Sequence, residues 1–187
     1  LFASLTSDNF PQLINQAQEH PMSPTIQLNE LLINAKHAPA HQSLLDFVRE
    51  TAKLKGTKEG CASGDCDACT VVLRDSDGNN PRNINSCITP VGAALGKQVI
   101  TIEGAGTPAN LHPVQKAMVD EHGSQCGFCT PGFVMSIVAA QMRGLGTNLE
   151  GDSSKRDAAI ESVSGNLCRC TGYRPIIDAA LIASDGT

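Results

Sequence analysis

Eight cysteines are the residues of this 187-residue chain with the clearest capacity for chemistry. They form two groups along the sequence, which are Cys61, Cys66, Cys69 and Cys87, then Cys126, Cys129, Cys168 and Cys170. Thiols only a few residues apart are poorly placed to link distant segments, whereas as thiolates they can converge on a metal centre. The bunching therefore favours metal ligation. Disulfide bonds are the alternative, which is typical of small secreted scaffolds.

The first group has the spacing of a plant-type [2Fe–2S] site, C-x4-C-x2-C followed by a distant fourth cysteine. Its loop reads GCASGDCDACTV and surrounds three thiols with small residues. Such a loop can curl around a cluster and point backbone N–H groups at the sulfurs, which helps to set the reduction potential. Gly60 and Gly64 are expected to adopt positive φ and to permit this close approach. Structural zinc is the alternative, although zinc loops usually pair two C-x2-C units or use histidines.

The second group reads QCGFCTPG and, further along, LCRCTGY. This spacing alone leaves zinc and iron open. Cys129 is followed by Thr130 and Pro131, which predict a helix start, and a further helix is expected after Cys170. Helix N-termini favour the negative charge of a thiolate-bound cluster. The pattern therefore predicts a second [2Fe–2S] cluster between two similar helical arms.

The elements that must position the first group are short strands and one helix. A lead-in over 1–24 is expected to be irregular, with some helical character near 10–17. Periodicity then predicts a helix over 43–54 that Ser43 caps. Strand patterns occupy 25–33 (with a turn at Asn29-Glu30), 69–75, 83–91 and 97–103. Together they predict an α+β unit that closes near Glu103.

The second group falls within a segment of helical periodicity. After a Gly/Pro-bearing connection at 104–110, helices are predicted over 112–123, 131–144, 153–165 and 173–183. Gly165 stands where a helix C-cap glycine belongs. Helices of this length and number predict a small bundle. The predicted organisation is a lead-in over 1–24, one domain over 25–104 and a second over 105–187.

Composition excludes some classes of function. A net charge of −5 without a long run of one sign argues against nucleic acid and anionic membranes as partners. The longest apolar segment is too short to span a bilayer. No basic region precedes an apolar stretch, so no secretory signal is visible and the thiols favour a cytoplasmic location. Leu1 stands where Met is expected, so the N-terminus of the protein is expected further upstream.

Three segments resemble the iron–sulfur portion of the xanthine dehydrogenase/aldehyde oxidase family of molybdenum hydroxylases, in particular the small subunit of bacterial xanthine dehydrogenase. They are GTKEGCASGDC, LHPVQKAMVDEHGSQCGFCTPGFVMS and SGNLCRCTGYRPIIDAA. The likeness runs from about residue 25 to 183. It implies a β-grasp plant-type [2Fe–2S] ferredoxin domain followed by an all-α four-helix-bundle [2Fe–2S] domain.

The resemblance also implies a role for each site residue. The first four cysteines would hold a cluster on the flavin side, and the last four a cluster on the molybdenum side. Gln125 and Cys170 would approach molybdopterin on a partner chain. Gly60, Gly64 and Gly127 would bring backbone close to the cofactors. Electrons would leave a molybdopterin-binding large subunit singly, pass both clusters, and reach an FAD-binding subunit or domain and then NAD.

Under this interpretation the chain is an electron-transfer subunit that does not turn over substrate alone. The alternatives within the family are the small subunit of an aldehyde, carbon monoxide or N-heterocycle dehydrogenase. A free-standing two-cluster ferredoxin is the alternative outside it. A zinc interaction module would be colourless.

Two features depart from the family pattern. Asp67 stands where the family usually has glycine, and aspartate tolerates left-handed backbone better than most residues. Its carboxylate is expected to disfavour the reduced cluster and lower its potential. The chain also stops about where an FAD domain would begin, so FAD is expected on another chain or in a domain that is missing here.

Overall fold

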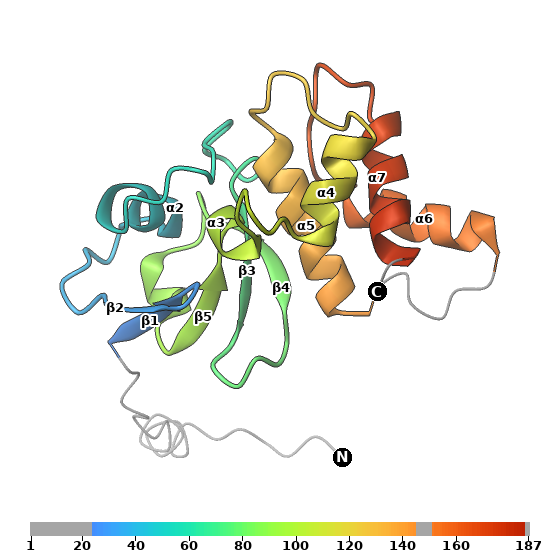
Figure 1. Cartoon of the computed structure of the whole chain (residues 1–187). Coiled ribbons are helices and arrows are strands. Elements are labelled where there is room, and N and C mark those ends of the chain that lie inside the picture. Colours follow the sequence, from blue (N-terminus) through green and yellow to red (C-terminus); the bar gives the residue numbers. More distant parts are fainter. Residues whose placement is uncertain (1–23, 145–150, 186–187) are drawn as a thin grey trace, which may run out of the picture.

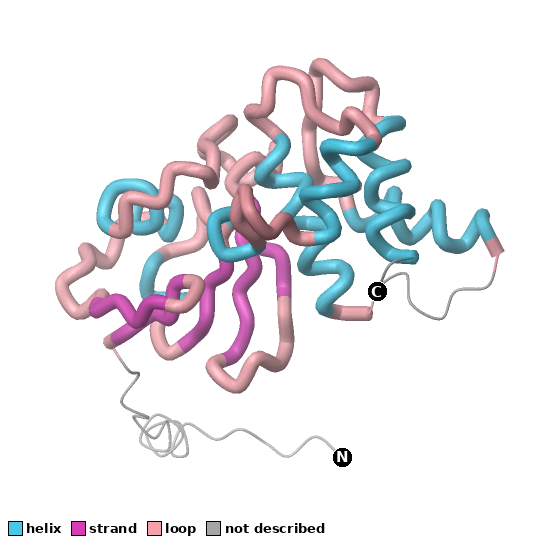
Figure 2. Tube along the Cα trace, in the orientation of Figure 1, coloured by secondary structure: helices cyan, strands magenta, loops and turns pink. Residues whose placement is uncertain are grey.

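The computed structural model of the chain describes residues 24–144 and 151–185 (Figure 1). Residues 1–23 of the lead-in expected over 1–24, and part of the loop after the second helix of the bundle, lie outside these residues. The described chain has strands gathered on one side and long helices on the other (Figure 2). This arrangement confirms the predicted α+β class.

Within 24–144 and 151–185 the sheet has five strands, in the order β2-β1-β5-β3-β4. Strands β1 and β5 are parallel, and the other neighbours are antiparallel. The strand expected over 25–33 is a hairpin, because Asn29 has a left-handed backbone with φ of 54°. The strands are β1 (Thr25–Leu28), β2 (Leu31–Asn34), β3 (Thr70–Asp75), β4 (Arg82–Asn85) and β5 (Lys97–Ile100).

The helix predicted over 43–54 is shorter in the structure. Ser43 does cap it, since its Oγ accepts a hydrogen bond of 3.0 Å from the Asp46 N–H. After α2 (Leu44–Asp46) the chain continues as a π-helix, η2 (Phe47–Thr51). A short 3₁₀ turn, η3 (Val91–Ala94), lies before β5.

Strand β5 ends before the predicted limit at Glu103. The Thr101 N–H donates to the Asn29 Oδ1 at 2.9 Å, and Glu103 Oε1 accepts from the Gly56 N–H at 2.7 Å. Residues 102–105 form the short helix α3 (Ile102–Ala105) instead. Side-chain partners thus turn the chain away from the sheet, so the predicted strand over 97–103 was too long.

The helices after α3 are the four that the periodicity predicts. They are α4 (Pro113–Asp120), α5 (Thr130–Met142), α6 (Asp152–Ser162) and α7 (Arg174–Asp185). Residues 132–140 of α5 are all buried, because this helix lies between the sheet and the other helices (Figure 1). Helices without a polar face are typical of such central positions.

Strand β3 is buried on both of its faces. Val71 and Leu73 pack in the core formed with α2 and η2, whereas Val72 packs in the core formed with α5. Successive residues of a strand point to opposite faces, so one strand serves both cores. The two predicted domains are therefore in direct contact through the sheet.

Two predicted helix ends were wrong in detail. Helix α5 has Cys129 as its N-cap, and Thr130 is already helical. Helix α6 ends at Ser162, and Gly165 lies beyond its cap without a left-handed backbone. The local sequence signal alone sets neither the start of α5 nor the end of α6, because each lies next to a thiol loop that packs against the other domain.

Ser136 is a polar residue inside the apolar centre of α5. This residue is 1 % exposed, and its Oγ has no hydrogen-bond partner among the residues that the structure describes. We expect Ser136→Ala to leave the free energy of unfolding unchanged or raise it by up to about 1 kcal/mol, because an unpaired buried hydroxyl is destabilising. Urea unfolding followed by circular dichroism would measure this. A clear loss of stability would show that the hydroxyl has a partner.

His112 begins α4 as its N-cap. Its Nδ1 accepts a hydrogen bond of 3.2 Å from the Val114 N–H, and the Gln115 Oε1 accepts one of 2.9 Å from the His112 N–H. Burial lowers the pKa of the His112 imidazole. The neutral ring suits this position, because a protonated ring would lose its acceptor and place positive charge at a helix N-terminus.

The His112 cap predicts a dependence of stability on pH. The folded-state pKa is lowered, so the unfolded chain takes up the proton first as pH falls. Stability should be complete above about pH 6.5 and decline as pH falls through the folded-state pKa. Unfolding of the wild type and of His112→Asn, which keeps a capping side chain, would be compared from pH 7 down to pH 5.5. Equal slopes in the two proteins would contradict this.

Candidate metal centres

The first group of thiols is assembled by the pairing of β3 with β4. Thr70 is opposite Asn85 in this antiparallel ladder, so Cys69 and Cys87 lie just beyond the same end of it. The Ser86 Oγ donates to the Cys69 carbonyl at 2.7 Å and fixes this end. The loop before β3 supplies Cys61 and Cys66. The pairing of these two neighbouring strands thereby brings together Cys69 and Cys87, which are 18 residues apart in the sequence.

Within this group the thiols approach one another in pairs. Cys61 and Cys66 are close enough to shift each other's pKa, and Cys69 shifts that of Cys87 more strongly than Cys61 does. Hydrogen bonds from Ser63, chiefly from its side chain, lower the pKa of the Cys61 thiol to about 6. Burial raises the pKa of Cys66, and burial together with Cys69 raises that of Cys87 to about 12.

The loop around Cys61 points backbone donors at sulfur, as its composition predicts. The N–H groups of Ser63 and Asp65 donate to Cys61 Sγ at 3.4 and 3.3 Å. Gly64 has a left-handed backbone with φ of 83°, whereas Gly60 does not. Gly60 is required for space instead, because a Cβ there would lie 2.8 Å from Cys66 Sγ.

The second group of thiols comes from the two loops that precede α5 and α7. Here too one neighbouring thiol has a larger effect on the pKa than the other thiols do, with Cys168 acting on Cys129 and Cys126 on Cys170. Burial and the contact with Cys168 raise the pKa of Cys129 to about 12. Burial alone would raise the pKa of Cys168, but hydrogen bonds from Thr171 and others outweigh it and lower that pKa.

Tyr173 holds the loop before α7 in place. Its hydroxyl oxygen accepts a hydrogen bond of 2.9 Å from the Cys168 N–H. Its ring packs edge-on against Phe133 of α5, with 6.1 Å between centroids. A contact to the core of the bundle therefore fixes the position of the Cys168 thiol.

The two pairs of the second group differ in exposure. Cys126 and Cys170 are exposed, as is Gln125 beside them, whereas Cys129 and Cys168 are half-buried. Gly127, between the two thiols of its loop, has a left-handed backbone with φ of 82° and open space around it. One pair thus faces outward, and the other lies toward the interior of the chain.

The loops of the two groups meet on one side of the molecule (Figure 1). The Leu167 N–H donates to the Cys66 carbonyl at 3.1 Å, and Asn166 Nδ2 donates to the Asp67 carbonyl at 3.2 Å. Phe128 reaches Gly60, because a Cβ on this glycine would lie 3.8 Å from its ring. The residue before Cys168 is therefore hydrogen-bonded to a residue of the first group.

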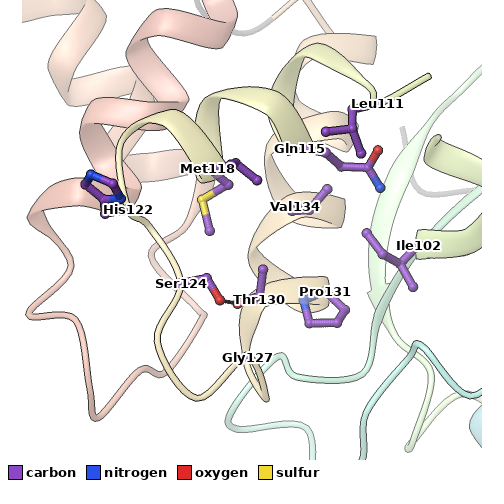
Figure 3. A pocket seen from close by; sticks show the side chains of 11 residues that line it. Ile102, Leu111, Gln115, Met118, His122, Ser124, Gly127, Thr130, Pro131 and Val134 are labelled. Carbon is purple, nitrogen blue, oxygen red and sulfur yellow. Dashed lines mark hydrogen bonds between the residues drawn. The ribbon is translucent and has the colours of Figure 1, made fainter. Parts of the chain in front are cut away.

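A pocket of about 490 Å³ lies beside the second group, between α3, α4 and α5. Figure 3 shows Met118 of α4 and Val134 of α5 lining it, with the hydrogen bond of 2.8 Å between Ser124 and Thr130 near one end. This hydrogen bond braces the loop that carries Gln125, Cys126 and Gly127. The pocket has mainly apolar walls and contains no cysteine.

The donor set fits two binuclear clusters. In the described part of the chain, no three Cys, His, Asp or Glu side chains gather as ligands of a single metal ion. The thiols form two pairs in each group, which matches a [2Fe–2S] cluster with four thiolates and two irons. The backbone donors to Cys61 and the Thr171 N–H donor to Cys168 Sγ, at 3.5 Å, suit thiolate sulfur.

The sequence did not identify the two asparagines that hold Asp67, one from the first domain and one from the second. Asn85 donates to the Gly64 carbonyl and to Asp67 Oδ1, and Asn166 bonds across the domain boundary. These are long-range contacts without a local motif. Tyr173 offered one signal, since it is the single tyrosine of the chain and follows a thiol loop.

None of the helices in the described residues has the length and the apolar character that crossing a membrane requires. Comparison with protein families gives two matches. A family described as "2Fe-2S iron-sulfur cluster binding domain" matches residues 34–92, and one described as "[2Fe-2S] binding domain" matches residues 101–181. The first match covers the first thiol group and the second match covers the other.

Comparison with individual known proteins also gives close matches. Xanthine dehydrogenase of Blastobotrys adeninivorans is 52% identical over 148 residues, which cover 77% of this chain and 10% of the relative. The aldehyde oxidoreductase structure from Desulfovibrio gigas matches with a TM-score of 0.70 and 40% identity over 86% of this chain and 16% of that one. The chain thus spans about a tenth of the length of its curated relatives.

One solved chain has nearly the same extent as this one. In quinoline 2-oxidoreductase from Pseudomonas putida 86 the match covers 88% of this chain and 94% of that chain, at 32% identity and a TM-score of 0.69. This match and the two thiol groups together identify the family to which the chain belongs. The chain belongs to the xanthine dehydrogenase/aldehyde oxidase family of molybdenum hydroxylases, of which it is the iron–sulfur portion.

Proposed function

We propose that this chain relays single electrons between the molybdenum site and the flavin of a molybdenum hydroxylase of the xanthine dehydrogenase type. The observation that carries the proposal is the contact between the two thiol groups. Each group can hold one centre, and the Leu167–Cys66 hydrogen bond joins the loops of the two groups. A bound [2Fe–2S] cluster accepts and releases one electron at a time.

The proposed ligands are the eight cysteines in the two groups predicted from the sequence. Cys61 and Cys66 would bind one iron of the first cluster, and Cys69 and Cys87 the other. Cys126 with Cys170 and Cys129 with Cys168 would divide the second cluster in the same way. The pairwise thiol contacts support this division. The boundary between domains at 25–104 and 105–187 is part of the proposal, and the two separate family matches support it.

The exposed pair, Cys126 and Cys170, indicates the end at which electrons would enter the relay. Cys126, Cys170 and Gln125 are exposed, so a partner that carries molybdopterin can approach them. Cys129 and Cys168 lie toward the first group, which would pass the electron on toward FAD. We propose a molybdopterin-binding chain or domain and an FAD-binding one as the partners, in a cytoplasmic enzyme where eight thiols stay reduced.

The relatives are named for different substrates, which fits an iron–sulfur portion that does not select the substrate. They are a xanthine dehydrogenase, an aldehyde oxidoreductase and a quinoline 2-oxidoreductase, and this chain resembles the same portion of each. The match over 94% of a quinoline 2-oxidoreductase chain makes an N-heterocycle dehydrogenase the second candidate.

Iron and acid-labile sulfide analysis, with EPR during stepwise reduction of anaerobically purified protein, tests the relay. We expect equal iron and sulfide and two distinguishable [2Fe–2S] signals. A colourless zinc protein or intact disulfides would contradict the proposal. Co-purification with a molybdenum-containing chain would separate a subunit of this family from a free-standing ferredoxin.

A further inference from the structure

Asp67 occupies the junction between the two thiol groups. It follows Cys66 directly, and its backbone is left-handed with φ of 53°. Its carbonyl oxygen accepts from the Thr70 N–H at 3.2 Å, from Thr70 Oγ1 at 2.8 Å and from Asn166 Nδ2 at 3.2 Å. These bonds from both domains fix the backbone from which the carboxylate projects.

The carboxylate itself is held between the domains. Its Oδ1 accepts from Asn85 Nδ2 at 2.7 Å, on the side of the first group. Its Oδ2 lies over Gly165, since a Cβ on this glycine would overlap that oxygen. Gly165 is three residues from Cys168. One carboxylate is thus packed against segments that carry ligands of both proposed clusters.

Among the described residues, no cationic side chain pairs with this carboxylate. Its neighbours on the two sides are an amide and a glycine, and its side chain is partly buried. A fixed negative charge that is not neutralised and only partly reached by water disfavours the addition of an electron nearby.

We propose that Asp67 sets the reduction potentials of both clusters, lowering each of them through one shared carboxylate. This inference rests on the relay proposed above and deepens it. A charge common to both centres moves their potentials in the same direction. It therefore changes how readily the chain as a whole accepts an electron, while the difference between the two centres changes less.

The test is a reductive titration of the full chain followed by EPR, with Asp67→Asn and Asp65→Asn. Asparagine at 67 keeps the size of the side chain and can still accept from Asn85, so it removes the charge alone. We expect the reduction equilibrium constants of both centres to rise by about threefold to thirtyfold, where tenfold corresponds to about 59 mV for one electron. Thermal unfolding of this variant should be unchanged.

Asp65 is the matched control, because it is an acidic residue of the same loop whose side chain is exposed and bonded to Ser63. Asp65→Asn should shift the first centre alone and by less. If Asp67→Asn shifts neither centre, or only the first, the shared role is wrong. If the wild type gives two normal signals and Asp67→Asn leaves both potentials unchanged, only this inference is overturned. Fewer than two signals in the wild type would overturn the proposed relay as well.

Discussion

Cys87→Ala should abolish one of the two [2Fe–2S] signals and remove half of the bound iron and sulfide. Cys87 is the distant member of the first group, and β3 and β4 bring it against Cys69. Without it the first cluster would lack one of its four thiolates. The second group draws its thiols from the loops before α5 and α7, so its signal should remain. Metal analysis and EPR of the reduced variant measure both outcomes.

Cys126→Ala is the reciprocal variant and should abolish the other signal. Cys126 is exposed, and its contact is with Cys170 in the same domain. The pair of variants assigns each signal to one group and supplies the assignment that the Asp67 titration needs. If either variant lost both signals, the two groups would not bind independently. If Cys87→Ala kept all of its iron, Cys87 would not be a ligand.

Gly132→Ala should be strongly destabilising although alanine is the better helix former. Gly132 is in the first turn of α5, and a Cβ there would overlap the Asp67 carbonyl oxygen and crowd Ala68. These are backbone atoms held by hydrogen bonds, so they cannot move aside as a flexible side chain could. We expect a loss of about 1–3 kcal/mol in the free energy of unfolding, the usual range for overpacking.

Gly92→Ala is the control for this variant. Gly92 is an exposed residue of the 3₁₀ turn η3, has no left-handed backbone, and a Cβ there would meet no described atom within 4 Å. Its substitution should be neutral or slightly stabilising. Denaturant midpoints from circular dichroism would compare the two variants with the wild type. Equal midpoints for Gly132→Ala and the wild type would mean that α5 can move away from the first loop without loss.

The sequence predicted the features that local pattern controls. Ser43 as a helix cap, the turn at Asn29 and the four helices of the bundle each follow from residues within one or two turns. Cysteine spacing also predicted the two thiol groups, but it reflects the curl of one loop only for Cys61, Cys66 and Cys69, since the pairing of β3 with β4 brings in Cys87 and two separate loops supply the second group. The residues that hold Asp67 in place were not predicted. Asn85 and Asn166 act on Asp67 from 18 and 99 residues away, and side-chain amides at such distances carry no periodic signal.

The wrong predictions share a physical cause. The strand expected to reach Glu103 ends early because Asn29 and Gly56 provide hydrogen-bond partners from other segments. Gly165 was expected to end a helix, but it leaves room for the Asp67 carboxylate. In both cases a tertiary contact determines the outcome, and the local pattern is compatible with either structure.

Strand β3 limits how this chain can be divided. Because Val72 belongs to the core of α5 while Val71 and Leu73 belong to the other core, neither half of the chain has a complete interior of its own. A fragment cut near residue 104 would present an uncovered apolar sheet face to water. The two cluster-binding modules are therefore not exchangeable parts, and recombination between relatives has to transfer them as one inherited unit.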